Sequence, residues 1–260
     1  MALWTDVADP QELTVVAREA ARDREQRDEF NLAQFLPNEH TLSQTVTLEA
    51  GENGFVEAAE YRAYDAETPI GGRGEGSRRI VFELPPLGQK RRVSEYNQLM
   101  FLGEGGESAI RTAIGKAAVL RGQAVADRME LERGRVLVSG KAAIDENGFI
   151  VDSDFGRDEE LTVTAGTKWG EDTADPVQDI LDWAEAYSDV NGETPAYIVA
   201  STKAIGALAK FTGFLPKDSI RRRASLDEIN ALLESEGLPQ LVRYDRRVRV
   251  NGVAERVIPQ

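Results

Sequence analysis

Residues 108–133, SAIRTAIGKAAVLRGQAVADRMELER, constrain the fold of this chain most, because nearly all of them favour one long helix. Residues of high helix propensity fill most positions, and the stretch contains no proline. Gly134 follows it directly. Apolar residues recur every three or four positions, which predicts a narrow apolar stripe along one side. A helix of this length spans about 40 Å, more than a compact domain usually needs. The stretch therefore predicts a spine on which sheets and loops are attached, with an ordinary core helix as the alternative.

Composition narrows the class of protein. Of the 260 residues, 41% are hydrophobic and 29% are charged, a balance typical of a folded globular chain. At this length we expect one large domain or two small ones. No apolar run approaches the ~20 residues of a membrane span, and the N-terminus lacks a basic region followed by an apolar segment. We expect a protein that is neither membrane-spanning nor exported.

The residue types present give little support to catalytic or metal chemistry. The chain has no cysteine and a single histidine, His40, which excludes disulfides, thiolate nucleophiles and metal sites with two imidazoles. A Ser-His-Asp triad would need His40, which lies in a polar stretch, and no nucleophile motif occurs elsewhere. We therefore predict no catalytic, cofactor-binding or metal-ligating residue.

Short matches to known motifs fail on their spacing or context. Residues 154–156 spell DFG, but the other sequences of a kinase do not accompany them. A calcium loop that began at Asp152 would need glycine where the chain has Arg157. The Gly-Lys pairs at Gly115 and Gly140 lack the rest of a P-loop. These matches are better explained by chance.

The N-terminal part predicts a helix and a long hairpin. Asp9-Pro10 is typical of a helix start, with an acidic cap before a proline at the first helical position. Residues 22–29, RDREQRDE, contain no apolar side chain, so we interpret them as a solvated helix end or, alternatively, as an arm on another subunit. The pattern also predicts strands at residues 45–48, 55–64 and 80–84, with a glycine-rich tip at residues 68–79. A hairpin of that length has little core of its own, so we expect it to lean on a neighbour.

The chain after the long helix predicts a hairpin and then a compact α/β unit. A turn signal at residues 145–148 separates strands expected at residues 135–144 and 149–154. The α/β unit has a predicted strand at residues 196–200 and predicted helices at residues 176–191, 202–211 and 225–236, the last opened by a capping box of Ser225 and Glu228. Strands at residues 241–250 and 253–258 are expected to pair across Asn251-Gly252.

Two runs of the sequence resemble the lambda-like major head proteins of tailed phages, the phage major capsid protein E family. The first run, RRIVFELPPLGQKRRVSEYNQL, covers residues 78–99, and the second, GRDEELTVTAGTKWGEDTADPVQDIL, covers residues 156–181. In the second run, the Gly-Arg opening, the Thr-rich strand, the segment around Trp169 and the Asp-Pro helix start are similar to that family's passage into its axial domain. The likeness covers most of the chain and indicates a family without indicating a site.

The resemblance implies an α+β protein with the tailed-phage major capsid (Johnson) fold. Residues 1–49 would form an N-terminal arm, 50–89 an extended loop, 90–174 a peripheral domain with the spine helix 108–133, and 175–260 an axial domain. Members of the family usually continue past the equivalent of Gln260, so we expect the axial domain to be incomplete and the chain to be a shortened product or a variant.

The resemblance also implies a structural protein rather than an enzyme. Hexamers and pentamers of it would close an icosahedral shell around a double-stranded DNA phage genome, in a virion assembled in the bacterial cytoplasm. Portal, scaffolding and decoration proteins would be its partners. The net charge of −14 predicts that packaged DNA is contacted weakly and non-specifically. By position in the chain, we expect contacts between subunits at Trp4, Arg73, Arg78 and Arg79.

The residues also bear on one property of some phage shells, which weld their subunits through a lysine of the extended loop. No lysine precedes Lys90 in this chain. We therefore predict no such crosslink.

Two other functions stay open at this point. An encapsulin-like bacterial compartment on the same fold would package a cargo enzyme instead of DNA. A small-molecule enzyme built on the C-terminal α/β unit would need placed carboxylates, and no recognisable motif places a pair. A soluble monomer with a saturable ligand would favour the enzyme, whereas closed shells would exclude it as the main role.

Overall fold

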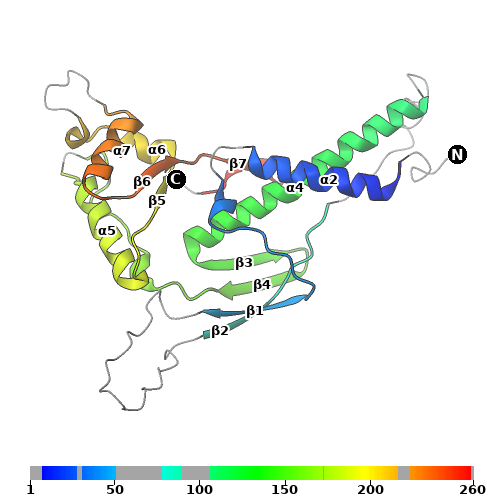
Figure 1. The fold of residues 1–260 in the computed structure, drawn as a ribbon, viewed down its shortest axis with the longest axis horizontal. Coiled ribbons are helices and arrows are strands. Elements are labelled where there is room, and N and C mark those ends of the chain that lie inside the picture. The colour runs from blue at the N-terminus through cyan, green and yellow to red at the C-terminus, as the bar shows by residue number, and fades with distance from the viewer. Residues whose placement is uncertain are drawn as a thin grey trace, which may run out of the picture. The chain divides into compact units, whose positions relative to one another are not determined.

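The computed structural model describes most of the chain as a mixture of helices and small sheets (Figure 1), which confirms the α+β class. The described residues are 8–27, 31–50, 78–89, 106–171, 173–215 and 223–258. The strand expected at residues 55–64 and nearly all of the glycine-rich tip lie outside them. The chain divides into two compact units. The first contains Met1–Thr41, Pro85–Val138 and Arg246–Val257, and the second contains Leu42–Leu84, Ser139–Asp245 and Ile258–Gln260.

Helix α4, Gly106–Ser139, is the predicted long helix and exceeds the prediction at both ends. Its 34 residues span about 50 Å. Gly134 does not end it, and a Cβ at this position would lie 2.4 Å from the Val257 carbonyl oxygen, so the close contact with Val257 explains why a glycine occurs inside the helix. The helix ends instead at Gly140, which has a φ of 70°. The strand predicted from residue 135 is therefore wrong over its first five residues, which are helical.

Helix α2, Pro10–Gln26, lies beside α4 in the first unit (Figure 1). Its predicted start is confirmed, since the Asp9 side chain accepts a hydrogen bond from the Gln11 backbone at 2.9 Å and proline occupies the first turn. The two helices approach so closely that a Cβ at Gly122 would overlap the carbonyl group of Ala17. A glycine inside α4 is thus explained by close helix packing, which offsets its low helix propensity. A short 3-10 helix, η1 (Leu32–Gln34), follows α2.

The first unit also contains the hairpin of β7 (Arg247–Val250) and β8 (Val253–Arg256). Its turn is the predicted Asn251-Gly252, and both residues have positive φ, 50° and 84°. The single strand predicted over residues 241–250 is wrong, because its first part is β6 (Gln240–Arg243), which pairs elsewhere. The chain leaves β6 where Tyr244 donates its backbone N–H to Ala200 and Asp245 accepts from the backbone of Thr202.

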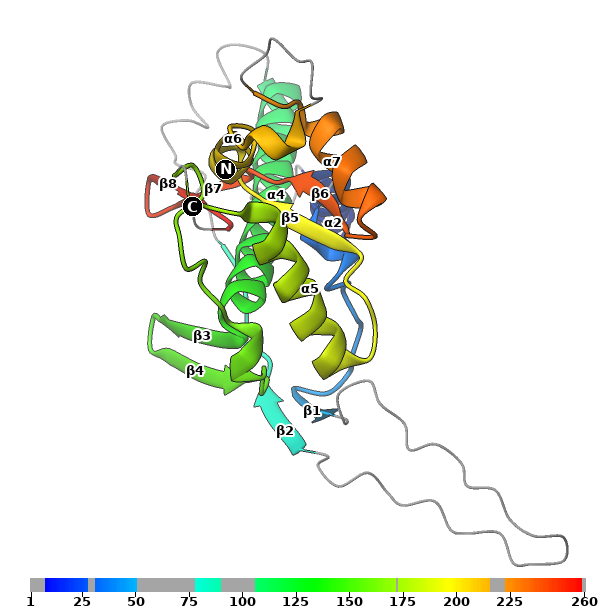
Figure 2. The ribbon, with the colours of Figure 1, turned by 90° about the vertical axis from the view of Figure 1, so that its left-hand side faces the viewer.

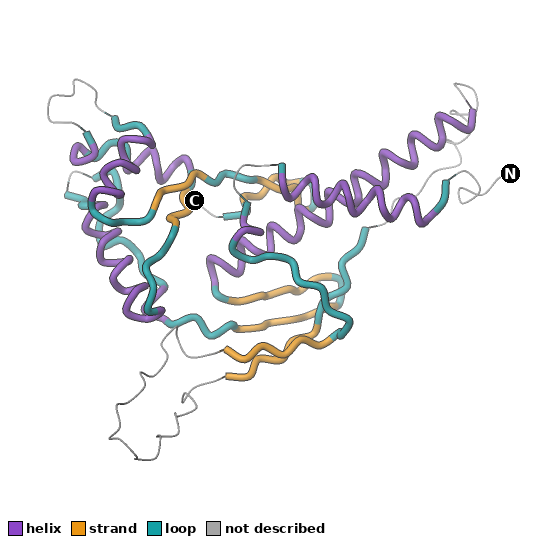
Figure 3. The backbone as a smooth tube through the Cα atoms, viewed as in Figure 1, coloured by secondary structure: helices purple, strands orange, loops and turns teal. Residues whose placement is uncertain are grey.

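Two antiparallel strand pairs open the second unit (Figure 3). Strand β1, Thr45–Ala50, pairs with β2, Arg78–Glu83, so the predicted strands at residues 45–48 and 80–84 are confirmed with shifted ends. Strand β3, Lys141–Glu146, pairs with β4, Phe149–Asp154, through the predicted Asn-Gly turn. Strand β2 lies next to β4.

The rest of the second unit is the compact α/β part that the sequence predicts (Figure 2). A short 3-10 helix, η2 (Glu159–Leu161), leads into α5 (Pro176–Asn191), β5 (Tyr197–Ala200), α6 (Thr202–Leu208), η3 (Thr212–Phe214) and α7 (Leu226–Ser235). The predicted capping box is confirmed, with Ser225 and Glu228 bonding each other's backbone N–H groups. Strands β5 and β6 pair in parallel. An apolar cluster packs them against the helices, with Ile180, Leu208, Phe214, Ile229, Leu233 and Leu241 among its buried members.

The described helices also bear on a membrane location. None of them combines the length and the apolar character that a bilayer span requires.

Candidate functional site

The contact residues expected from sequence position are not brought together by the described structure. Trp4 and Arg73 lie outside the described residues. Arg78 and Arg79 begin β2, opposite Ala50 and Glu49 of β1, and the structure describes their backbone alone. Their roles therefore stay predictions.

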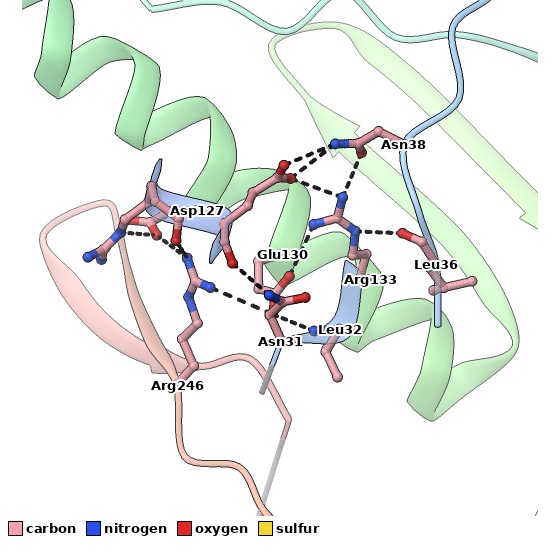
Figure 4. A network of polar contacts seen from close by, with 10 residues as sticks. Asn31, Leu32, Leu36, Asn38, Asp127, Glu130, Arg133 and Arg246 are labelled. Carbon is pink, nitrogen blue, oxygen red and sulfur yellow. Dashed lines mark hydrogen bonds and ion pairs between the residues drawn. The ribbon is translucent and has the colours of Figure 1, made fainter. Parts of the chain in front are cut away.

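A different group of charged residues does converge, in the C-terminal half of α4 in the first unit (Figure 4). We call it the polar junction and define it as three arginines and three carboxylates: Arg24, Glu25, Asp127, Glu130, Arg133 and Arg246. The α4 members recur at every third position, so they share one helix face. The other members come from the end of α2 and from the residue before β7. The junction thus joins three segments that are far apart in the sequence.

Asp127 connects α2 and the C-terminal hairpin to α4. Arg24 binds it in a bidentate manner, with Nε to Oδ1 at 2.9 Å and Nη2 to Oδ2 at 3.2 Å. Arg246 donates to the same Oδ1 at 3.1 Å and also to the Arg24 carbonyl oxygen at 3.3 Å. Paired arginine–carboxylate hydrogen bonds fix orientation as well as distance. One aspartate therefore sets the position of two arginines from opposite parts of the chain.

Glu130 lies at the centre of the junction and is fully buried, with 0% of its side chain exposed. Its Oε1 accepts from the Leu32 backbone N–H at 2.9 Å and lies 3.8 Å from the Arg246 guanidinium. Its Oε2 accepts from Arg133 at 3.1 Å. Burial of an unpaired carboxylate costs several kcal/mol, so Glu130 can be buried here only because these partners pair with it.

Arg133 fastens the chain that follows α2. Its Nε donates to the Leu36 carbonyl oxygen at 3.0 Å, and its Nη2 donates to Asn38 at 2.6 Å and to Glu25 at 3.0 Å. Asn38 in turn donates to both carboxylate oxygens of Glu25, at 3.2 and 3.1 Å. The segment between α2 and β1 is therefore tied to α4 through its backbone and its side chains.

The charges of the polar junction balance, with three cations against three anions. The side chains of Arg133 and Arg246 are each only 7% exposed, so most of these charges lie away from solvent. A buried network of this kind is geometrically specific when all of its members are paired. It holds segments together and offers no nucleophile beside a base. Among the described residues, no group of three or more histidine, cysteine, aspartate or glutamate side chains could hold a metal ion.

Sequence reasoning missed the polar junction, although a signal was present. The run RDREQRDE at residues 22–29 has no apolar side chain, and the favoured interpretation was a solvated helix end. That interpretation is wrong for Arg24 and Glu25, which pair with Asp127 and Arg133 of α4. The recurrence of Asp127, Glu130 and Arg133 at i, i+3 and i+6 of the long helix is the feature that could have found their partners.

Comparison with known proteins agrees with the resemblance seen in the sequence. A model of the phage major capsid protein E family matches residues 12–260. A solved structure of a phage-related protein from Bordetella bronchiseptica is similar at 16% sequence identity, with a TM-score of 0.49 over 95% of this chain and 73% of that one. No curated protein matches the chain. The family match supports neither an encapsulin-like compartment nor an enzyme, and it extends over almost the whole sequence. The chain therefore belongs to the phage major capsid protein E family, as a structural protein of the virion that assembles with copies of itself into the capsid.

Proposed function

We propose that this chain is the shell subunit of a tailed-phage head, with the Johnson fold, and that its hexamers and pentamers close an icosahedral shell around double-stranded DNA. The observation that carries the proposal is the family match over residues 12–260. The long helix α4, Gly106–Ser139, supports it, since a helix of this length serves as a spine for the elements attached to it.

The proposed domain assignment follows the order of elements along the chain. Residues 1–49 are the N-terminal arm, 50–89 the extended loop, 90–174 the peripheral domain and 175–260 the axial domain, with the hairpin of β7 and β8 returning to the unit that contains α4. The pairing of β1 with β2 supports the loop, because the two strands enclose residues 51–77. The apolar cluster of α5, α7 and β6 supports a separately packed axial domain.

In this proposal the polar junction fixes the geometry of the first unit before the subunit meets its neighbours. Glu130 and Arg133 tie the segment after α2 to α4, and Asp127 ties the end of α2 and Arg246 to the same helix. Closed point-group shells use the same surfaces many times, so a fixed geometry within the first unit favours repeated, identical contacts.

Further partners belong to the same proposal. Portal, scaffolding and decoration proteins contribute to a complete head, which assembles in the bacterial cytoplasm. Trp4, Arg73, Arg78 and Arg79 are proposed to contact neighbouring subunits. The net charge of −14 keeps packaged DNA from adhering to the shell, so that it enters and leaves freely.

Negative-stain electron microscopy of the chain, expressed with its neighbouring genes and purified by size, tests the proposal. Uniform closed shells are the expected result. If only small soluble species form, the measurement is repeated with a chain extended beyond residue 260. Small species again from the extended chain would contradict the shell function.

Two further experiments address the loop. Deletion of residues 71–76 is expected to leave the subunit folded and to impair assembly, and normal shells from that deletion would exclude the loop assignment. Because no lysine precedes Lys90, denaturing electrophoresis of the shells is expected to show monomer. A ladder of covalent oligomers would contradict the absence of a loop crosslink.

A further inference from the structure

One arginine at the base of the β7–β8 hairpin reaches the end of helix α2. Arg246 donates through its Nη2 to Asp127 Oδ1 of α4 at 3.1 Å (Figure 4) and to the Arg24 carbonyl oxygen at 3.3 Å. Arg24 lies in the last turn of α2, and the carbonyl groups of a last turn have no partner within their own helix. Arg246 therefore caps α2 from a position 222 residues further along the chain.

The charge of Arg246 suits this position. A cation near the C-terminus of a helix is favourable, because the carbonyl groups there carry a partial negative charge. The Arg246 side chain is only 7% exposed, so solvent screens the interaction little. The same guanidinium lies 3.8 Å from Glu130, which accepts a hydrogen bond from the backbone N–H of Leu32 at the start of η1. One buried arginine thus acts on α2 and on the segment that follows it.

Arg246 is also part of the hairpin's own framework. Its carbonyl oxygen accepts a hydrogen bond at 3.1 Å from the N–H of Val257, which directly follows β8. Val257 is buried against Gly134 of α4, and Val248 of β7 is buried as well. The position of Arg246 is therefore set by both strands of the hairpin and by their packing. If the hairpin leaves α4, the arginine leaves the end of α2 with it.

Helix α2 has little apolar packing of its own to replace that contact. Among its side chains Ala20 is buried, whereas Val15 and Val16 are 58% and 40% exposed. A helix of 17 residues is marginal in water unless tertiary packing stabilises it. The charged contacts at its C-terminal end therefore contribute a large part of what holds α2 in place.

We propose that the hairpin of β7 and β8, with Arg246 at its base, is a latch: α2 is held on α4 only in subunits whose hairpin is docked. Coupling between two sites is reciprocal, so release of α2 also loosens the hairpin. The chain is synthesised from its N-terminus, so α2 and α4 exist before Arg246 is added. The latch therefore closes late, after most of the subunit has been made.

The latch has a consequence for assembly, which rests on the proposed shell function. Helix α2 lies within residues 1–49, the proposed N-terminal arm. A subunit whose hairpin has not docked presents this arm without a fixed geometry, whereas a closed shell repeats the same contacts many times. The latch thus keeps incompletely folded subunits out of the shell.

Hydrogen exchange on the whole subunit tests the coupling in both directions. Arg246→Ala is expected to raise the exchange rate of α2 amides about tenfold or more, and Arg24→Ala to raise that of β7 and β8 amides. The two substitutions remove parts of one network, so the double variant is expected to exchange little faster than the more affected single variant. Arg247→Ala removes an exposed arginine of the same hairpin and is expected to leave α2 unchanged.

A second pair of variants loosens a hairpin without removing any member of the polar junction. Gly252→Val places a β-branched residue at a φ of 84° in the turn between β7 and β8, and Gly148→Val does the same at a φ of 82° between β3 and β4. A Cβ at either glycine meets no atom within 4 Å, so both variants act through the backbone. The latch predicts faster exchange of α2 in Gly252→Val and unchanged exchange of α2 in Gly148→Val, the matched control in the second unit.

Faster exchange confined in every variant to the substituted segment would overturn the latch. So would equal loosening of α2 by Gly252→Val and Gly148→Val, because α2 would then report only overall stability. Electron microscopy of the same variants separates the latch from the shell function. Coupled exchange in a wild-type chain that forms no shells supports the latch and contradicts the shell function alone. Normal shells from Arg246→Ala, with α2 loosened, would overturn the consequence for assembly.

Discussion

The two units of this chain are held together by different kinds of interaction. In the first unit Glu130, an acid whose partners come from three segments, is as fully buried as Leu32. In the second unit the most buried groups are apolar, with Leu208, Ile229 and Leu233 fully inaccessible. Apolar burial contributes stability in proportion to area and sets few directions. Charged hydrogen bonds contribute less net stability but fix the geometry of the groups they join.

The kind of interaction that holds each unit together follows from the residues that each unit contains. Helix α2 has one buried residue, Ala20, and α4 has a narrow apolar stripe, so their contact offers little apolar area. The polar junction supplies specificity where that area is small. The α/β part of the second unit instead closes around a contiguous apolar cluster, as a small domain must if it is to fold by itself. The comparison predicts different responses to mutation.

The largest effect is expected for Glu130→Ala. It removes the shared partner of Arg133, Arg246 and the Leu32 N–H, and loss of one member of a buried ion pair costs about 3–5 kcal/mol. Chemical denaturation measures the loss, and hydrogen exchange is expected to locate it in α2 and α4. Glu19→Ala, which removes an exposed ion pair with Arg22, serves as the control and is expected to change stability by less than about 1 kcal/mol. If Glu130→Ala lowers the free energy of unfolding no more than Glu19→Ala does, the polar junction does not stabilise the first unit.

Leu233→Ala tests the apolar side of the comparison. The leucine is fully buried in the cluster of the second unit, and truncation of such a side chain costs about 2–5 kcal/mol. Hydrogen exchange is expected to show faster exchange in α7 and β6, with α2 unchanged. Faster exchange in α2 as well would mean that the two units unfold together.

Gly122→Ala tests the close packing of α2 on α4. An added Cβ would overlap the carbonyl of Ala17, so a backbone must shift, at a cost of about 1–3 kcal/mol. Gly115→Ala is the matched control on the same helix, because a Cβ there meets no atom within 4 Å. That control is expected to stabilise the protein by up to about 1 kcal/mol through helix propensity. Thermal unfolding of both variants measures the change in Tm, which is expected to be negative for Gly122→Ala and positive for Gly115→Ala. Equal changes in Tm would contradict the close packing.

The smallest effect is expected for Ser225→Ala. It removes the capping box at the start of α7 and is expected to cost about 1 kcal/mol, confined to the second unit. Ser225→Asp keeps an acceptor for the Glu228 N–H and serves as its control. A loss from the alanine variant that the aspartate variant does not share, measured by chemical denaturation, would confirm the cap.

Local signals in the sequence determined much of this protein. The start of α2 at Asp9-Pro10, the turns at Asn147-Gly148 and Asn251-Gly252, and the cap of α7 all follow from short stretches whose backbone geometry depends on the residues themselves. The presence of one long helix at α4 and the family of the chain were also readable, since both depend on extended patterns.

Tertiary structure alone decided the features that depend on distant partners. Gly134 has a low helix propensity and yet lies inside α4, where the contact with Val257 leaves no room for a larger residue. Residues 241–250 read as one strand and divide into β6 and β7 because β6 pairs with β5 and Arg246 pairs with Asp127. Arg24 and Glu25 look solvated in sequence and lie in the polar junction because their counter-ions are about a hundred residues away. The sequence by itself states which residues can be charged or apolar, and the fold decides which of those charges meet, because Coulomb and hydrogen-bond energies depend on distances that only packing sets.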